Sequence, residues 1–192
     1  MDTTASALMG LLRLTLSDPR AAARRVMALP LPRAARWQAL ALVIVLSMLF
    51  GQVAVLLMAG QGPDALMVGM IQGAVLLMLV YGVHMVGRVL GGRGAFEDAL
   101  ILIAWLQGVM VAVQVAQIVA LLILPPLTGL LGFLGMALFL WLLTNFVAEL
   151  HRFTSLGKVF GMILLTLFGV AIVAAILLQM LGIQPPAGMT DV

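Results

Sequence analysis

Long apolar runs alternate with short polar segments along this chain, and the alternation predicts its fold. Five runs are long enough for a helix to cross a hydrocarbon core of roughly 30 Å, at about 1.5 Å of rise per residue. They cover residues 37–59, 65–90, 96–124, 127–149 and 156–181. A closed membrane barrel needs alternation within strands of about ten residues, which these continuous runs lack. We therefore predict an all-α, polytopic integral membrane protein built as a five-helix transmembrane bundle.

Positive charge lies at or beside only one set of alternating ends of these runs. The basic residues precede the first run, separate the second from the third, or separate the fourth from the fifth. In chain order they are Arg13, Arg20, Arg24, Arg25, Arg33, Arg36, Arg88, Arg93, Arg152 and Lys158. The connections near Pro63 and Pro125 and the tail after Gly182 have none. Because positive flanks stay on the cytoplasmic side during insertion, we predict a cytoplasmic N-terminus and an outside C-terminus.

The segment before the first run predicts an amphipathic helix. Asp18 is placed to cap it, Pro19 suits its first position, and it should end near Leu29. Ala22 and Val26 fall on one face. The opposite face is basic, and its members, which we expect to contact lipid headgroups, are Arg20, Arg24 and Arg25. The alternative is a solvated charged linker.

Composition agrees with a membrane protein and limits the partners. The chain is 64% hydrophobic and 9% charged, far from the usual balance of a soluble domain. We expect a cytoplasmic basic amphipathic region at 1–36, a five-span domain at 37–182 and a short tail at 183–192. The basic residues are too dispersed to follow a nucleic-acid backbone, so membrane lipids are the expected partner. The absence of cysteine excludes disulfides and thiolate metal sites.

Polar amides form a stripe on the third span. Gln107, Gln114 and Gln117 share one helical face, and Asn145 on the fourth span should join them inside the bundle. Unsatisfied polar groups in hydrocarbon cost several kcal/mol, so these side chains should not face lipid. The favoured interpretation is hydrogen bonding between helices. The alternative is a polar route for a small solute or a lipid headgroup.

Ionisable side chains gather at the predicted cytoplasmic ends of the spans. The candidate cytoplasmic cluster comprises His84, Arg88, Arg93, Glu97, Asp98, Glu149, His151, Arg152 and Lys158. Glu97 and Asp98 open a span, where acids complement the helix dipole, and are expected to pair with Arg93 or Arg88. Glu149 is expected to pair with Arg152 or Lys158. Two histidines with unrelated spacing give only a weak metal signal.

Sequence motifs that carry catalysis are nearly absent. There is no HExxH, no serine elbow and no phosphate-binding glycine loop followed by Lys-Ser or Lys-Thr. The segment GGRG at 91–94 follows a membrane helix and is interpreted as a flexible connection with a basic tip. An intramembrane enzyme centred on His84, Glu149 and His151 is the least supported reading. We expect no enzymatic activity, no cofactor and no metal.

Glycines four residues apart predict close helix packing, in pairs at 69 and 73, 87 and 91, and 157 and 161. Contacts within the chain are the expected use of these positions. A homo-oligomer, or association with other membrane proteins, is the alternative.

Several short segments resemble the bacterial members of the Yip (Ypt-interacting protein) family of five-span membrane proteins. They are LSDPR at 16–20, LGGRGAF at 90–96, and His151, Arg152, Ser155, Gly157 and Lys158 before the last run. The resemblance implies a helical bundle with a cytosolic N-terminus. Eukaryotic relatives associate with small GTPases in membrane traffic, but the long N-terminal region and acidic-leucine-tyrosine-glycine-proline motif of those relatives are not seen here. Neither a GTPase partner nor any binding residue is therefore carried over.

The leading functional hypothesis is a non-enzymatic membrane protein that organises membrane or partner proteins at its cytoplasmic face, in the bacterial cytoplasmic (inner) membrane. The alternative is a transporter or lipid-translocating protein, with its route along Gln107, Gln114 and Gln117. The first requires partners at the cytoplasmic face, whereas the second requires water or headgroups beside the third span.

Overall fold

The computed structural model describes residues 4–60 and 64–180, and in this part of the chain it has seven helices and no strand. They are α1 (Thr4–Ser17), α2 (Pro19–Met27), α3 (Arg33–Ala59), α4 (Ala65–Val89), α5 (Phe96–Ile123), α6 (Pro126–His151) and α7 (Leu156–Met180). Helices α3 to α7 are each long and apolar enough to cross a membrane. The protein is therefore an integral, multi-pass membrane protein, as the apolar runs predicted. The expected tail at 183–192 and the turn residues Gly62 and Pro63 lie outside the described residues.

The spans agree with the predicted runs to within a few residues, and the largest difference is at the start of the first. Helix α3 begins at Arg33 rather than Trp37. Pro32 has an extended backbone (ψ 156°) and stands at the N-cap, so the helix can start directly after it. Its first turn contains Arg33 and Arg36, which are charged and so were not counted in the apolar run. The helix therefore extends beyond the hydrophobic segment at its charged end.

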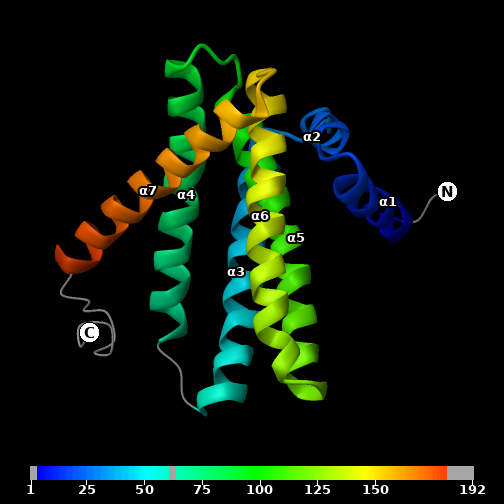
Figure 1. Cartoon of the computed structure of the whole chain (residues 1–192), viewed down its shortest axis with the longest axis vertical. Helices are drawn as coiled ribbons and strands as arrows, with labels where there is room; N and C mark the ends of the chain where they lie inside the picture. The colour runs from blue at the N-terminus through cyan, green and yellow to red at the C-terminus, as the bar shows by residue number, and fades with distance from the viewer. Residues whose placement is uncertain (1–3, 61–63, 181–192) are drawn as a thin grey trace.

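Helix α5 is the centre of the bundle and packs against α3 on one side and α6 on the other (Figure 1). Half of its most apolar 18-residue window is buried, compared with 11% for α3 and 17% for α7. A helix that is apolar on most of its surface suits this position because its faces meet protein or lipid. Helix α4 packs against α3 and α7, and α7 runs obliquely away from the α3–α5–α6 core.

Large apolar side chains are exposed on the outer helices. Leu66 on α4 is 70% exposed, and Phe168 on α7 is 65% exposed. In water such surface would be costly, but in a bilayer it meets acyl chains. The exposed apolar surface is therefore that of a protein surrounded by lipid.

The N-terminal region contains two helices, of which the sequence predicted only the second. Asp18 caps α2 by accepting from the backbone N–H of Ala21 at 2.9 Å, and Pro19 occupies the first turn, as predicted. The helix ends at Met27, two residues earlier than expected, and Leu29 lies exposed outside it. Helix α1 (Thr4–Ser17) was not predicted, because its residues show no strong amphipathic pattern.

Helix α2 packs on α6 and α5 at the end of the bundle. Its residues Ala22 and Ala23 are fully buried, and Val26 is 1% exposed. The apolar face expected to lie in the membrane interface thus packs on protein. Upstream, Thr15 is fully buried and its hydroxyl accepts a hydrogen bond from the Trp105 indole N–H of α5 at 3.0 Å. The N-terminal helices are therefore attached to the bundle at two places.

Close approach at glycine is found for some of the predicted pairs only. A Cβ built on Gly69 would lie 2.5 Å from Met48 Sδ of α3, so this glycine allows α4 to approach its neighbour. Around Gly157 and Gly161 on α7 nothing lies within 4 Å. The expectation that these two pack within the chain is wrong, because α7 leaves the core and exposes them.

Candidate functional site

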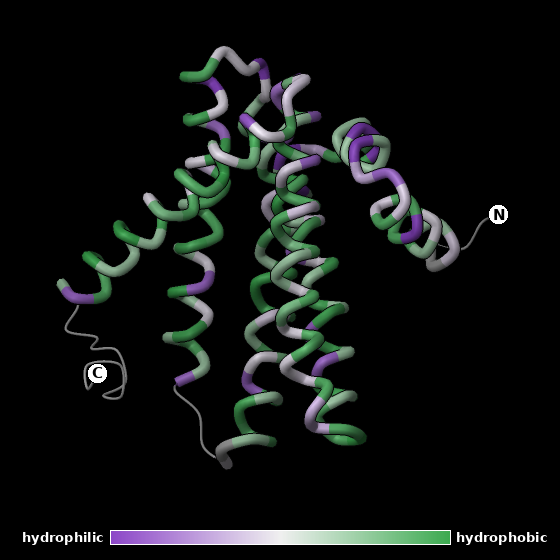
Figure 2. The backbone as a smooth tube through the Cα atoms, viewed as in Figure 1, coloured by the Kyte–Doolittle hydropathy of each residue, from purple (hydrophilic) through white to green (hydrophobic). Residues whose placement is uncertain are grey.

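Polar groups gather at one end of the bundle, called here the basic end. It comprises α2, the α4–α5 connection at 90–95 and the α6–α7 connection at 152–155. Figure 2 shows hydrophilic segments concentrated there, including along α2. At the opposite end, Asp64 is the one charged residue of the described ranges, and it caps α4 by accepting from the Met67 N–H at 2.8 Å. The charge asymmetry of the sequence is thus a property of the folded bundle.

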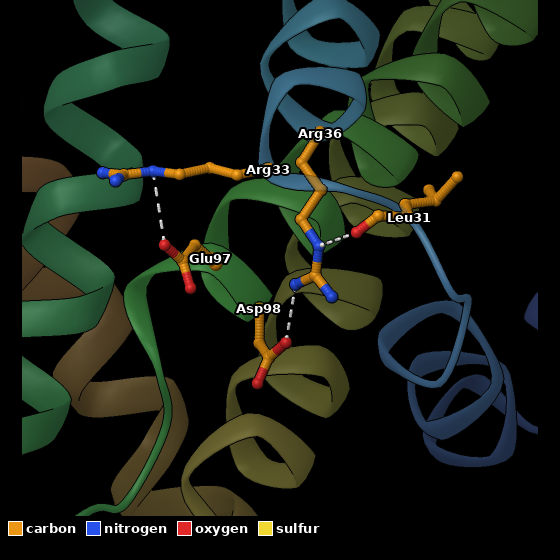
Figure 3. A network of polar contacts seen from close by, with 5 residues as sticks. All are labelled: Leu31, Arg33, Arg36, Glu97 and Asp98. Atoms are coloured by element: carbon orange, nitrogen blue, oxygen red, sulfur yellow. Dashed lines mark hydrogen bonds and ion pairs between the residues drawn. The ribbon is translucent and has the colours of Figure 1, made fainter.

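Two ion pairs join the start of α3 to the start of α5 (Figure 3). Arg36 donates to Asp98 at 2.8 Å, and Arg33 lies 3.4 Å from Glu97. Arg36 also donates to the carbonyl of Leu31 at 3.4 Å. The predicted pairing of these acids with Arg93 or Arg88 is wrong. Helices α3 and α5 pack side by side, so the first turn of α3 brings Arg33 and Arg36 to these two acids. Nearness in space therefore decides the pairing, and nearness in sequence does not.

A third ion pair holds α2 to the end of α6. Arg24 lies 3.1 Å from Glu149, rather than the expected Arg152 or Lys158. An acid at a helix C-terminus opposes the helix dipole and benefits from a nearby cation. Helix α2 supplies that cation. On the same side of α2, Arg20 donates to the carbonyl of Phe153 at 3.4 Å, so two of the arginines predicted to contact lipid have partners within the protein.

His151 joins the two connections of the basic end. The side chain is 2% exposed, its Nδ1 accepts from the Gly94 N–H at 3.2 Å, and its Nε2 lies 3.2 Å from the carbonyl of Val83. The two partners together assign the proton to Nε2, which then donates to the carbonyl. Phe153 stacks on the ring at 5.6 Å between centroids. His151 thus has a structural role that the sequence did not reveal.

Three glycines create the space that this histidine fills. A Cβ on Gly87 or on Gly92 would overlap the His151 side chain, and one on Gly94 would come within 2.9 Å of its Cε1. Gly91 has a left-handed φ of 88°, which allows the chain to turn there without strain. The segment predicted as a flexible connection is therefore packed around an imidazole. The glycines were visible in the sequence, but the histidine that they surround lies about 60 positions away.

His84 contacts an aromatic row rather than His151. Its ring meets Phe96 edge-on at 5.8 Å between centroids, and Phe96 lies 6.2 Å from Trp37. Of the other predicted members, Arg88 and Lys158 lie exposed in the last turn of α4 and the first turn of α7, and Arg93 and Arg152 lie exposed in the two connections. In the described ranges no three His, Asp or Glu side chains gather in a metal-binding arrangement.

The glutamine stripe forms hydrogen bonds between helices. Gln107 donates to the Ser47 hydroxyl of α3 at 2.6 Å, and Ser47 donates to the Gln114 carbonyl oxygen at 3.2 Å. Ser47 is 2% exposed and was missed in the sequence, although a single serine within an apolar span is a usable signal. Asn145 donates to the carbonyl of Trp141 on its own helix at 2.8 Å. Hydrogen bonding between helices is confirmed for Gln107 and Gln114.

We expect Gln114→Cys to react poorly with a small, membrane-impermeant maleimide added from either side of the membrane. The native side chain is half-buried and accepts a hydrogen bond from Ser47 of α3. Labelling is measured in membranes, and no native cysteine interferes. Asp64→Cys, at an exposed position, is the control that should label from one side. Labelling of Gln114→Cys as fast as this control would instead place water at the stripe.

Five apolar helices with charged groups gathered at one end define a helical, multi-pass membrane protein. The family model described as the Yip1 domain matches residues 13–178, which is most of the chain. The chain belongs to the Yip1-domain family, as the resemblance predicted. Proteins of this family are not known as enzymes. No curated protein and no solved structure is significantly similar to the chain.

Proposed function

We propose that this protein is a non-enzymatic membrane protein that organises membrane lipids or partner proteins at its basic end. One observation supports this role above others: α2 and both short connections meet at that end, so segments far apart in sequence form one polar surface. Among the described residues, the opposite end has a single charged side chain, that of Asp64. We further propose that the basic end is cytoplasmic, since positive flanks stay inside during insertion, and that the membrane is the inner membrane of a bacterium.

The surface available for contact consists of the cations without a close acidic partner. Exposed members of the predicted cluster and of the basic face of α2 are Arg25, Arg88, Arg93, Arg152 and Lys158. Exposed basic residues near an anionic leaflet each contribute roughly 1 kcal/mol of attraction. The division into a contact region at 1–36, a five-span domain at 37–182 and a tail at 183–192 belongs to the same proposal.

Photo-crosslinking in living cells tests the organising role. A photoreactive amino acid placed at Arg25 or Arg88, both exposed at the basic end, should give discrete protein or lipid adducts, detected by mass spectrometry. The same amino acid at Asp64, exposed at the opposite end, is the matched control. If the basic-end positions give no more adducts than Asp64, the proposed role fails.

A further inference from the structure

A cleft of about 650 Å³ opens at the basic end between three segments of the chain. Helix α2, the α4–α5 connection and the end of α6 with its following connection form its walls. Its charged lining residues are Arg20, Arg24, Arg93, Asp98, Glu149 and Arg152. Its volume is within the range of small-molecule sites, roughly 300–1,000 Å³.

The two acids in the cleft are already paired. Glu149 has Arg24 at 3.1 Å, and Asp98 has Arg36, from outside the cleft lining, at 2.8 Å. In the described part of the chain the side chains of Arg93 and Arg152 make no ion pair or hydrogen bond. Positive charge therefore predominates in the cleft, and a concave surface of one sign concentrates ions of the other.

Arg20 has a donor without a partner. Its Nε is shut off from solvent and makes no hydrogen bond in the described structure, and its other contact, to the carbonyl of Phe153, is a long 3.4 Å. A buried charged donor left unsatisfied is unfavourable. An oxyanion that contacts both Nε and one terminal nitrogen of a guanidinium forms two parallel charge-assisted hydrogen bonds. Because Nε is closed to solvent, a phosphate in the cleft forms this pair of bonds only if the Arg20 side chain turns toward the cleft that it lines.

Arg152 occupies a backbone conformation that favours glycine. Its φ is 58°, and it is the one described non-glycine residue with a positive φ. It ends α6, with the Phe153 N–H donating to the carbonyl of Ala148 at 2.8 Å. Helices commonly place glycine there because a Cβ is disfavoured. An arginine at such a position indicates that its side chain has a use other than ending the helix.

We propose that this cleft binds a phosphate-bearing anion through Arg20, Arg93 and Arg152, while the Arg24–Glu149 pair holds α2 in place beside it. The phosphate belongs to a lipid headgroup or to a soluble phosphate, since both present the same oxygens. This ligand would bind at the surface described under the proposed function. The inference rests on that proposal for one point, that the basic end lies near the lipid headgroups.

The test measures binding to the purified full chain in uncharged detergent micelles. The probes are dioctanoyl phosphatidic acid, inorganic phosphate and, as a neutral control, dioctanoyl glycerol, with dissociation constants from calorimetry. We expect saturable binding of a phosphate probe and none of the neutral lipid. Arg152→Gly and Arg93→Ala should each weaken binding about tenfold or more, because a charged hydrogen-bond donor is lost. Arg13→Ala, an exposed arginine on α1 outside the cleft, should leave binding unchanged.

Arg152→Gly is the decisive variant because glycine suits the backbone at this position. Its thermal midpoint should equal or exceed that of the native chain, so a loss of binding cannot be attributed to unfolding. Binding of phosphatidic acid alone would support a lipid headgroup as the ligand, and equal binding of inorganic phosphate would support a soluble one. No binding of either probe, or equal effects of Arg152→Gly and Arg13→Ala, would overturn the proposal. Crosslinking to partners does not depend on this result, so the two proposals fail separately.

Discussion

Gly87→Ala should destabilise the protein by about 3 kcal/mol, the upper end of the range for overpacking a core. The added Cβ would overlap the His151 ring. That ring cannot move aside, because Gly92 and Gly94 pack against its other parts and Phe153 stacks on its face. The measurement is reversible unfolding in mixed detergent micelles with increasing denaturing detergent.

Removing the histidine should rescue this variant in part. His151→Ala alone removes the partner of the Gly94 N–H and of the Val83 carbonyl and opens a cavity. We expect it to lower the free energy of unfolding by about 2–4 kcal/mol. In the double variant the new methyl group lies in that cavity. Its loss of stability should therefore be smaller than the sum of the two single losses by at least about 1 kcal/mol. Additive effects would contradict the contact between Gly87 and His151.

Gly161→Ala is the matched control for Gly87→Ala. Nothing lies within 4 Å of the position, and alanine is favoured over glycine in a helix by about 1 kcal/mol. We expect stability to stay the same or rise slightly. If both glycine variants behaved alike, the loss at Gly87 would reflect a general sensitivity of membrane helices to substitution.

Ala23→Asp should detach α2 from the bundle. Ala23 is fully buried where α2 packs on α6 and α5, and an unpaired carboxylate there costs several kcal/mol. A helix of nine residues held by small side chains, the Arg24–Glu149 ion pair and the long Arg20–Phe153 hydrogen bond cannot compensate for this, so the least costly response is release of the N-terminal helices. The five spans should remain folded because their contacts are separate.

Limited proteolysis measures this release. Trypsin cuts after arginine only when the chain can unfold into its active site, so docked α2 should resist cleavage after Arg24 and Arg25. In the Ala23→Asp variant, cleavage should be at least about tenfold faster, which corresponds to about 1.4 kcal/mol. Ala28→Asp, at the exposed end of the same helix, adds the same charge without burying it and should be cut at the native rate. Equal rates in all three chains would mean that α2 is not held by its buried face.

The spans could be predicted from sequence because a helix that crosses the hydrocarbon core requires a continuous run of apolar residues, which is a local feature of the chain. A continuous apolar run, a proline and a change of charge define each end within a few residues. The cap at Asp18 followed from the same local reasoning. Interhelical packing was predictable for the glutamine stripe, since exposing an amide to lipid is costly, and for the close approach at Gly69 and Gly87.

The ion pairs and the role of His151 were not predictable because they depend on which helices are neighbours. Glu149 was matched with the nearest basic residues in the sequence, whereas its partner Arg24 is more than 120 positions away and was brought near by α2. Glycines at 87, 92 and 94 suggested close approach or flexibility without identifying the side chain between them. Thr15 and Trp105 gave no indication that they would meet.

Two contacts described above can form only after α6 has been made: the packing of α2 on α6, and the insertion of His151 between the glycines of the α4–α5 region. Synthesis proceeds from the N-terminus, so α2 leaves the ribosome long before the surface of α6 that it covers. The pocket formed by Gly87, Gly92 and Gly94 likewise waits for His151, the last residue of α6. Until α6 enters the membrane, α2 has only its contacts with α1 and α5, and the pocket for His151 is empty. Completion of α6 is therefore the step at which a partly inserted chain becomes distinguishable from a finished one.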